Sequence, residues 1–327
     1  MRAIELNGFG GPEVMEWTVT VDPEPGPGEV LIEVVAAGVN RADVMQRRGF
    51  YPPPPDASSV PGLECSGTIV ELGAGVTDWQ VGDRVCALLA GGGYAELAAV
   101  PTTQLLPVPE EMDLAAAAGL PEVAATVWSN LVMTAGMGSG QLVLIHGGGG
   151  GIGTHAIQVA RRRGARVAVT AGSDEKLAKC AGLGAEILVN YRTQDFVTVL
   201  ADAGGADIIL DNMGAAYLER NVEALAPHGR LVVIGLQGGT TGSLNIGGLL
   251  RKWGSVHATN LRARPRAGVG SKAEVIAAVR TQLWPDVVAG EIFPVISAEL
   301  PITEAGRAHE LLDAAETFGK VVLRVRD

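Results

Sequence analysis

The chain has 327 residues, of which 47% are apolar, and its 36 acidic and 25 basic side chains give a net charge of −11. This acidic balance disfavours nonspecific binding to nucleic acid or to an anionic membrane. No apolar segment approaches the roughly 20 residues that a membrane-spanning helix needs, and the first residues lack the order of a signal peptide. We therefore expect a cytoplasmic protein of about two domains, with no membrane segment and no nucleic-acid partner.

The first part of the chain has the composition of a β domain. Up to about residue 110 it is dense in Gly and Pro, and runs such as "EVLIEVVAAG" and "GTIVEL" are typical of strands. Its two cysteines, Cys65 and Cys86, and the later Cys180 are too far apart for a disulfide framework or a zinc ribbon. The sequence therefore predicts a mostly β domain over residues 1–120 that has no structural zinc.

From about residue 141 the pattern changes to strand, glycine-rich turn and helix. The runs "QLVLIH", "ARVAVTA", "EILVN", "ADIILDNM", "GRLVVIG" and "GSVHATN" alternate with helical stretches. This alternation predicts an α/β domain with a doubly wound parallel sheet over residues 121–261. Three glycines stand where helices should end, namely Gly164, Gly184 and Gly229.

The remaining residues, 262–327, are expected to return to the first domain. "SKAEVIAAVRTQLW" is helical in pattern, and "KVVLRVRD" predicts a final strand. The preceding segment already supplies six strands to the parallel sheet, so this strand is expected to belong to the other domain.

Five consecutive glycines lie in "VLIHGGGGGIGTHAIQVA", residues 143–160. Only one register of the pattern G-x-G-x-x-G fits, and it uses Gly148, Gly150 and Gly153. Because the motif follows a strand and opens a helix, it predicts a dinucleotide-binding turn, with Gly151 and Ile152 at the helix N-terminus near the pyrophosphate.

The end of the second strand indicates which dinucleotide binds. In "VTAGSDEK" the strand-end positions Ala171 and Gly172 carry no acid, whereas Ser173 and Lys176 suit a 2′-phosphate, which favours NADP over NAD. Asp174 allows two interpretations at this point: it binds the ribose, or it interacts with the helix dipole.

Motifs along nearly the whole chain resemble a known family. They are "GGPEVM", "VNRADVMQRRGFYPPPP", "PGLECSG", "AAAAGLPEVAATVW", "GGGGGIGTHAIQVA", "TAGSDEKL", "NYRTQDF" and "LDNMG". The chain resembles the zinc-independent, zeta-crystallin-like NADPH quinone oxidoreductases of the medium-chain dehydrogenase/reductase superfamily. The resemblance implies a Rossmann nucleotide domain beside a GroES-like catalytic domain, NADPH as cofactor, a quinone or related electrophile as substrate, and a homodimer paired through "GSVHATN".

The resemblance also implies site residues. At the positions where related alcohol dehydrogenases bind zinc stand Asn40, Leu63 and Glu122, so a zinc site is not expected. Asn40 and Tyr51 are the implied catalytic residues, beside the nicotinamide and the substrate. The implied 2′-phosphate site consists of Ser173, Lys176 and Tyr191, with Arg192 in support. Further cofactor-binding candidates are Thr126 and, after the fourth and fifth strands, Asn212, Met213, Gly235, Leu236 and Gln237.

Several alternatives stay open at the level of sequence. The same hydride delivery serves an enone or 2-alkenal reductase, and some zeta-crystallin-like proteins are NADPH-binding structural or RNA-associated proteins, although the acidic balance opposes the latter. His146 and His155 flank the glycine motif, and we expect packing roles for them. Arg262 and Arg264 reach either the cofactor and substrate mouth or a solvated turn.

Overall fold

The computed structural model describes residues 1–314 and 316–326. The chain divides into two compact units. Unit 1 comprises residues 1–125, 261–288 and 294–327, and unit 2 comprises residues 126–260 and 289–293. No helix among the described residues is long and apolar enough to cross a membrane.

Unit 2 is built on a six-stranded parallel sheet in the order β10-β9-β8-β11-β12-β13. This order, with the first strand of the unit at the centre, is that of a doubly wound dinucleotide-binding domain. The six predicted strands are thus confirmed. Their bounds are Leu142–His146 (β8), Arg166–Ala171 (β9), Ile187–Asn190 (β10), Ala206–Asp211 (β11), Leu225–Val233 (β12) and Ser255–Ala258 (β13).

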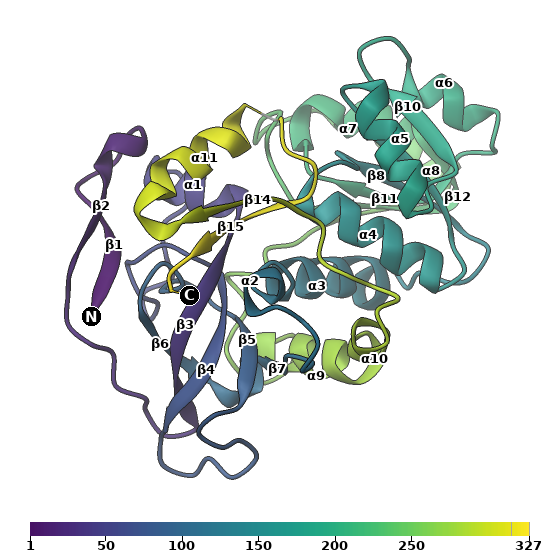
Figure 1. Ribbon diagram of the computed structural model, residues 1–327. Helices are drawn as coiled ribbons and strands as arrows, with labels where there is room; N and C mark the ends of the chain where they lie inside the picture. The colour runs from purple at the N-terminus through teal and green to yellow at the C-terminus, as the bar shows by residue number, and fades with distance from the viewer. Residues whose placement is uncertain (315, 327) are drawn as a thin grey trace. The chain divides into compact units, whose positions relative to one another are not determined.

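Helices pack in two groups on this sheet (Figure 1). Leu142 and Leu144 of β8 belong to the core cluster formed with α6 and α7, while the alternate residues of the strand point to the opposite face. The first group is α4 (Gly151–Arg162) and α5 (Asp174–Leu183). The second group is α6 (Phe196–Ala201), the short η4 (Gly214–Tyr217), α7 (Leu218–Ala224) and α8 (Ile246–Arg251). The segment η3 (Trp128–Thr134) stands at the start of the unit, before β8.

The helix ends of unit 2 follow the predicted glycines in two of three cases. Gly164 and Gly184 lie just after α4 and α5 with left-handed φ values of 77° and 111°. The prediction for Gly229 is wrong, because α7 stops at Ala224 and Gly229 lies inside β12. The preceding residue, His228, has φ 61° and lies where β12 is irregular, because the register of β12 against β11 shifts between Leu225 and Arg230.

Unit 1 contains a mixed sheet in the order β14-β15-β3-β4-β5-β7, with β6 also paired to β3, and a separate hairpin of β1 and β2. The C-terminal strand β15 lies antiparallel beside β3 (Figure 1). The strand bounds are Arg2–Leu6 (β1), Met15–Val19 (β2), Glu29–Val39 (β3), Glu64–Leu72 (β4), Arg84–Leu88 (β5), Leu97–Pro101 (β6), Leu105–Pro107 (β7), Ile296–Pro301 (β14) and Lys320–Arg324 (β15).

Short helices connect and cover these strands. Ser271 caps α9 by accepting a hydrogen bond from the Glu274 amide, as the helical pattern after residue 262 predicts. The helices of this part are η1 (Pro12–Val14), α1 (Arg41–Arg47), η2 (Thr102–Gln104), α2 (Leu114–Ala117), α3 (Pro121–Val127), α9 (Lys272–Gln282), α10 (Trp284–Val288), η5 (Ile302–Glu304) and α11 (Ala305–Asp313).

Candidate functional site

The glycine run of unit 2 forms the turn between β8 and α4. Gly147 has φ 70°, so the left-handed residue of the turn precedes the predicted motif by one position. A Cβ atom on Gly148 would lie 2.8 Å from the Cβ of Val169, and one on Gly153 would collide with the Gly147 carbonyl oxygen. At Gly150 the nearest described atom would be 3.5 Å away. The first and third motif glycines are therefore needed for packing, while the second leaves bare backbone open to a phosphate at the N-terminus of α4.

Four predicted side chains converge at the end of β9, around Gly172. Ser173 caps α5 by accepting a hydrogen bond from the Lys176 amide. The hydroxyl of Tyr191 lies 2.5 Å from where a Cβ on Gly172 would be, and Nε of Arg192 lies 3.6 Å from that point. Partial burial lowers the pKa of Lys176; Glu175 opposes this, and the cations Lys179 and Arg192 lower the pKa further. This corner thus gathers hydroxyl groups and two mutually repelling cations, which suits an anion.

Asp174 is engaged within this corner. Its Oδ1 accepts a hydrogen bond of 2.7 Å from Nδ2 of Asn190, and Oδ1 of Asn190 accepts one of 3.1 Å from the Arg192 amide. The carboxylate therefore holds the loop after β10 that carries Tyr191 and Arg192. Of the two interpretations left open by the sequence, this contact favours a structural role at the N-terminus of α5.

The loops after β11 and β12 lie against the glycine turn. Nδ2 of Asn212 is 2.8 Å from where a Cβ on Gly147 would be, and Gly235 packs against Asn212 equally closely. The Gly238 amide donates to the Met213 carbonyl at 2.7 Å. The segments 212–214 and 235–238 thus meet at the point where the strand order reverses, which is where doubly wound sheets bind their ligands.

A buried hydrogen-bonded chain fixes these strand ends. Nδ1 and Nε2 of His146 contact Thr170 Oγ1 at 3.1 Å and Asn221 Oδ1 at 2.8 Å, and Thr170 Oγ1 also accepts from the Gly147 amide. Burial lowers the pKa of His146 to about 4, so the ring is neutral at pH 7. Asp211, whose pKa burial raises to about 6, accepts from the amides of Met213 and Gly214.

The second histidine beside the motif, His155, is also buried. Neither of its ring nitrogens has a hydrogen-bond partner within the part of the chain that the structure describes. Burial lowers its pKa to about 3. Both histidines therefore occupy packed positions, as expected.

Thr126 begins unit 2 and is buried. Its carbonyl accepts a hydrogen bond of 2.7 Å from Nδ2 of Asn130, whose Oδ1 accepts one of 2.6 Å from Thr259. Asn130 lies in the π-helical segment η3, and such irregular turns are frequent at functional sites. The backbone at Thr126 is thus tied to the residue that follows β13.

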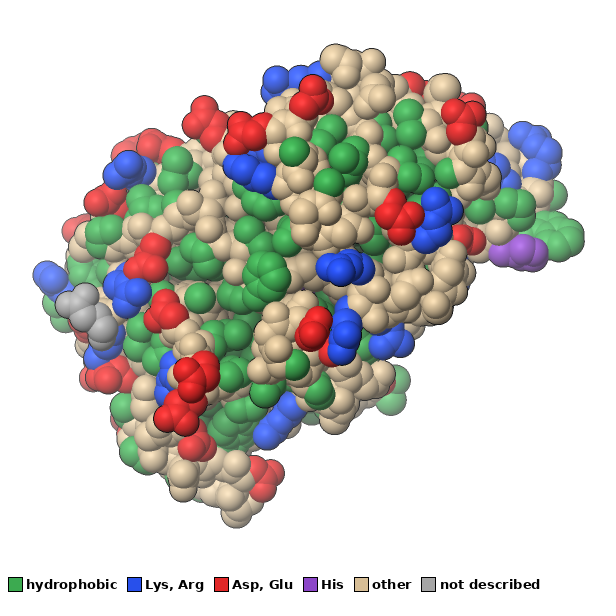
Figure 2. All heavy atoms as spheres, turned by 45° about the vertical axis from the view of Figure 1, so that its right-hand side comes forward, with side chains coloured by type: hydrophobic (Ala, Val, Ile, Leu, Met, Phe, Trp, Pro, Cys, Tyr) green, Lys and Arg blue, Asp and Glu red, His purple; other side chains and the backbone are tan. Residues whose placement is uncertain are grey.

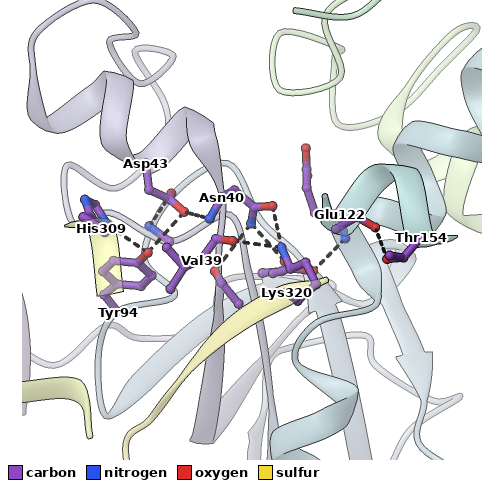
Figure 3. Close-up of polar contacts among 12 residues, drawn as sticks. Val39, Asn40, Asp43, Tyr94, Glu122, Thr154, His309 and Lys320 are labelled. Atoms are coloured by element: carbon purple, nitrogen blue, oxygen red, sulfur yellow. Dashed lines mark hydrogen bonds and ion pairs between the residues drawn. The ribbon is translucent and has the colours of Figure 1, made fainter. Parts of the chain in front are cut away.

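In unit 1, Asn40 lies at the centre of a buried polar cluster (Figure 3). Its Oδ1 accepts a hydrogen bond of 2.6 Å from Nζ of Lys320, and its Nδ2 donates to Oε1 of Glu64 at 2.9 Å. Because an ammonium only donates and a carboxylate only accepts, the orientation of the amide is fixed. The second hydrogen of Nδ2 has only a long contact of 3.4 Å with the Gly38 carbonyl.

Lys320 and Glu64 form an ion pair of 2.6 Å, and their side chains are only 5% and 0% exposed. The ammonium also donates to the Val39 carbonyl, so its three hydrogens have three acceptors. The other carboxylate oxygen of Glu64 accepts from the Glu122 amide at 2.9 Å. A Cβ on Gly38 would collide with Glu64, so a glycine is needed there.

Asp43 extends this cluster on the other side of Asn40 (Figure 3). Its carboxylate accepts hydrogen bonds from the amides of Asn40 and Gly62 and from the hydroxyl of Tyr94. The Tyr94 hydroxyl is also 3.2 Å from Nε2 of His309. Burial raises the pKa of Asp43 to about 6, although these hydrogen bonds oppose the shift. Asp43 thus fixes the backbone at the start of α1, on which Asn40 lies.

Tyr51 is partly buried in the loop that follows α1. The guanidinium of Arg262 lies over its ring, 5.2 Å from the ring centroid, and is itself only 4% exposed. Arg264 instead donates to the Gly270 carbonyl within its own turn. Of the two arginines, only Arg262 is thus placed beside a predicted site residue.

The residues that stand where related alcohol dehydrogenases bind zinc do not suit a zinc site. Leu63 is buried and has no donor atom, and both polar atoms of the Asn40 amide are bonded to Lys320 and Glu64. A metal ion bound by Asn40 and Glu64 would have to displace the ammonium of Lys320, which both side chains already contact.

Sequence reasoning missed several residues of these clusters. Glu64 lies within the quoted motif "PGLECSG" and Lys320 begins the predicted last strand, yet neither was assigned a role. The signal available was a charged residue inside an otherwise apolar strand pattern, which indicates a buried pair. Thr170 and Asn221 carry no such signal.

Comparisons with known proteins agree with this architecture. The alcohol dehydrogenase GroES-like domain matches residues 26–110, and the zinc-binding dehydrogenase family matches residues 151–268. A quinone oxidoreductase of Rattus norvegicus is 32% identical over 331 residues, which cover 99% of this chain and 97% of the relative. The chain belongs to the quinone oxidoreductase family of the medium-chain dehydrogenases/reductases.

Two further members of this superfamily illustrate its range. A 2-haloacrylate reductase of a Burkholderia species is 31% identical over 340 residues, covering 99% of this chain and 98% of the relative. The crystal structure of Escherichia coli quinone oxidoreductase complexed with NADPH superposes with a TM-score of 0.86 at 28% identity, covering 99% of this chain and all of that one. The predicted family and the predicted Rossmann and GroES-like domains are thus confirmed.

The buried pair leads to a stability prediction. We expect Lys320→Met to destabilise unit 1 by about 3–5 kcal/mol, because the carboxylate of Glu64 would stay buried without its cation. The measurement is thermal and chemical unfolding. The control is Arg324→Gln on the same strand, which breaks a partly exposed ion pair with Glu299 and should cost about 1 kcal/mol or less. Equal stability of the two variants would contradict the buried ion pair.

Proposed function

We propose that this quinone oxidoreductase reduces quinones with NADPH and without a metal. The observation that carries the proposal is the cluster of Lys320, Glu64 and Asn40. Its member Asn40 stands where related alcohol dehydrogenases have a zinc ligand. Since all three hydrogens of the ammonium are committed, Lys320 has none left with which to polarise the carbonyl of a simple ketone. A quinone needs no such activation, because two-electron reduction restores an aromatic ring.

NADPH supplies the hydride when it is bound, and the residues of unit 2 fit it. The open backbone at Gly150, with Gly148, Gly151, Ile152 and Gly153, receives the pyrophosphate. Ser173, Lys176 and Tyr191, supported by Arg192, bind the 2′-phosphate. The nicotinamide half is assigned to Thr126, Asn212, Met213, Gly235, Leu236 and Gln237. The two basic side chains at the corner around Gly172, Lys176 and Arg192, support NADPH over NADH.

Asn40 and Tyr51 are proposed to act on the acceptor. The amide hydrogen of Asn40 that has only the long contact to Gly38 is available to a quinone oxygen, on which negative charge develops as the hydride arrives. One hydride and one proton together convert the quinone into the hydroquinone. The proton comes either from the Tyr51 hydroxyl or from water. When Tyr51 donates it, water returns a proton to the phenolate.

A second candidate is reduction of an activated carbon–carbon double bond, and the match to a 2-haloacrylate reductase along the whole chain favours it. That reaction uses the same hydride but needs a proton at the adjacent carbon. An RNA-associated role has less support. The chain has a net charge of −11, and on the face shown in Figure 2 positive and negative side chains are interspersed.

The test is NADPH oxidation by the purified protein with a panel of quinones, 2-chloroacrylate and an enone. We expect the quinones to give the highest kcat/KM, because they accept hydride without electrophilic activation. Faster turnover of 2-chloroacrylate or the enone would replace the proposal by double-bond reduction. Absence of turnover with every acceptor, together with tight binding of an RNA oligonucleotide, would contradict both.

We propose in addition that the protein forms a homodimer through β13. This strand is the edge of the sheet in unit 2, and the neighbouring Ile246, Leu250 and Trp253 are 67%, 69% and 74% exposed. An exposed edge strand beside apolar side chains is suited to pairing with a second copy. Sedimentation at twice the chain mass, lost on Val256→Pro, is the expected result.

The cofactor assignment leads to a quantitative prediction. A charge-assisted hydrogen bond contributes roughly 1.5–3 kcal/mol, so Lys176→Ala should weaken NADPH binding by about 10- to 100-fold. NADH lacks the 2′-phosphate and should respond little. The measurement is the ratio of kcat/KM values for the two cofactors before and after the substitution.

The matched control for this prediction is Lys179→Ala, on the same helix. Lys179 forms an exposed ion pair with Glu175, and its loss should leave the cofactor ratio unchanged. A wild-type preference for NADH, or equal weakening of both cofactors by Lys176→Ala, would remove the phosphate pocket from the corner around Gly172.

A further inference from the structure

The guanidinium of Arg262 is one of the most deeply buried cations of unit 1. Its Nε donates to the Ala90 carbonyl at 2.8 Å, one terminal nitrogen donates to the Tyr51 carbonyl at 3.1 Å, and the other donates to Oε1 of Gln46 at 2.6 Å. The same group lies over the Tyr51 ring. A planar fork of this kind fixes its partners in direction as well as in distance.

The loop held in this way has few backbone donors in its first part. Tyr51 is followed by the four prolines 52–55, which have no backbone N–H and so donate no hydrogen bonds. The segment from residue 51 to residue 63 contains no helix or strand. A cavity of about 350 Å³, lined in part by Pro54, Ser58, Ala90 and Arg262, borders the loop.

A second contact from the same segment of chain anchors the far end of the loop. Arg266 donates to the Asp56 carbonyl at 2.9 Å and forms ion pairs of 3.1 Å with the carboxylates of Asp56 and Glu29. This arginine is 50% exposed, and the residue of the loop that it contacts, Asp56, lies five positions after Tyr51. The two arginines therefore contact different parts of the loop. Arg266 binds Asp56, whereas Arg262 contacts both the backbone and the ring of Tyr51.

We propose that Arg262 is a positioning residue for the reaction, which holds the Tyr51 phenol in the single orientation from which it serves the quinone. The cation over the ring fixes the plane of the phenol, and the hydrogen bond to the carbonyl fixes its backbone. This inference rests on the proposed function of Tyr51. It adds a residue 211 positions away in the chain to the determinants of turnover.

The test is a double-mutant cycle with 1,4-benzoquinone and NADPH. Arg262→Met and Tyr51→Phe are each expected to lower kcat by about 10-fold or more, since a small misplacement of a reacting group has large effects on rate. The double variant should be no slower than the slower single variant, because both changes remove the same function. Affinity for NADPH, measured by protein fluorescence, should stay within about 2-fold.

Two further variants separate positioning from folding. Arg262→Lys keeps the charge but cannot reach three acceptors together, so it should recover part of the lost kcat. Arg266→Gln removes the neighbouring anchor without touching Tyr51 and should retain kcat within about 2-fold. If Arg262→Met does not fold, the cycle is measured with Arg262→Lys. A smaller loss of kcat is then expected, and a double variant no slower than Tyr51→Phe is the supporting result, whereas multiplicative effects overturn the inference.

Multiplicative effects of the two single variants, an unchanged kcat in Arg262→Met, or an equal loss in Arg266→Gln would each overturn the inference. A wild-type protein that reduces no quinone would contradict the proposed function instead. The inference is then decided by hydrogen exchange of the peptide spanning residues 46–58. Faster exchange in Arg262→Met than in Arg266→Gln supports it, and equal exchange overturns it.

Discussion

The arrangement of unit 1 depends on the need of one buried ammonium for three acceptors. Lys320 finds them in the Val39 carbonyl, the Asn40 amide and the Glu64 carboxylate. These groups belong to the end of β3, the residue before α1 and the start of β4, and the lysine itself begins β15. Because a buried charge is tolerated only when it is fully paired, this requirement fixes the register at which the last strand joins the first ones.

The same requirement shapes the chemistry of the site. The Asn40 amide can present only one hydrogen outward, since its oxygen and its other hydrogen are held by the ion pair. Asp43 fixes the backbone of the same residue from the other side. A fixed dipole of this kind needs no reorganisation as charge develops on a substrate oxygen, which supports the role proposed for Asn40 in hydride transfer to a quinone.

In unit 2 the main constraint is steric, because the chain must pass very close to its neighbours at the turn between β8 and α4. The glycine turn is set by packing at Gly148 and Gly153, and the His146–Thr170–Asn221 chain ties its first amide to β9 and α7. The sheet, the motif register and the helix start at Ser173 were predictable, because each depends on residues close together in the sequence. The error at Gly229 arose because strand and helix-end glycines look alike until the tertiary contacts of β12 are known.

The sequence by itself determined the doubly wound sheet and the glycine register, since these follow from local periodicity and from residue type. Its resemblance to a known family implied that Leu63 and Asn40 stand in place of zinc ligands. Only the tertiary structure decided that Lys320 meets Asn40, 280 positions away, and that Arg262 meets Tyr51, 211 positions away. The physical reason is that a lysine at a strand start or an arginine in a turn is ordinarily solvated. Its burial and partners depend on long-range packing, which local pattern does not encode.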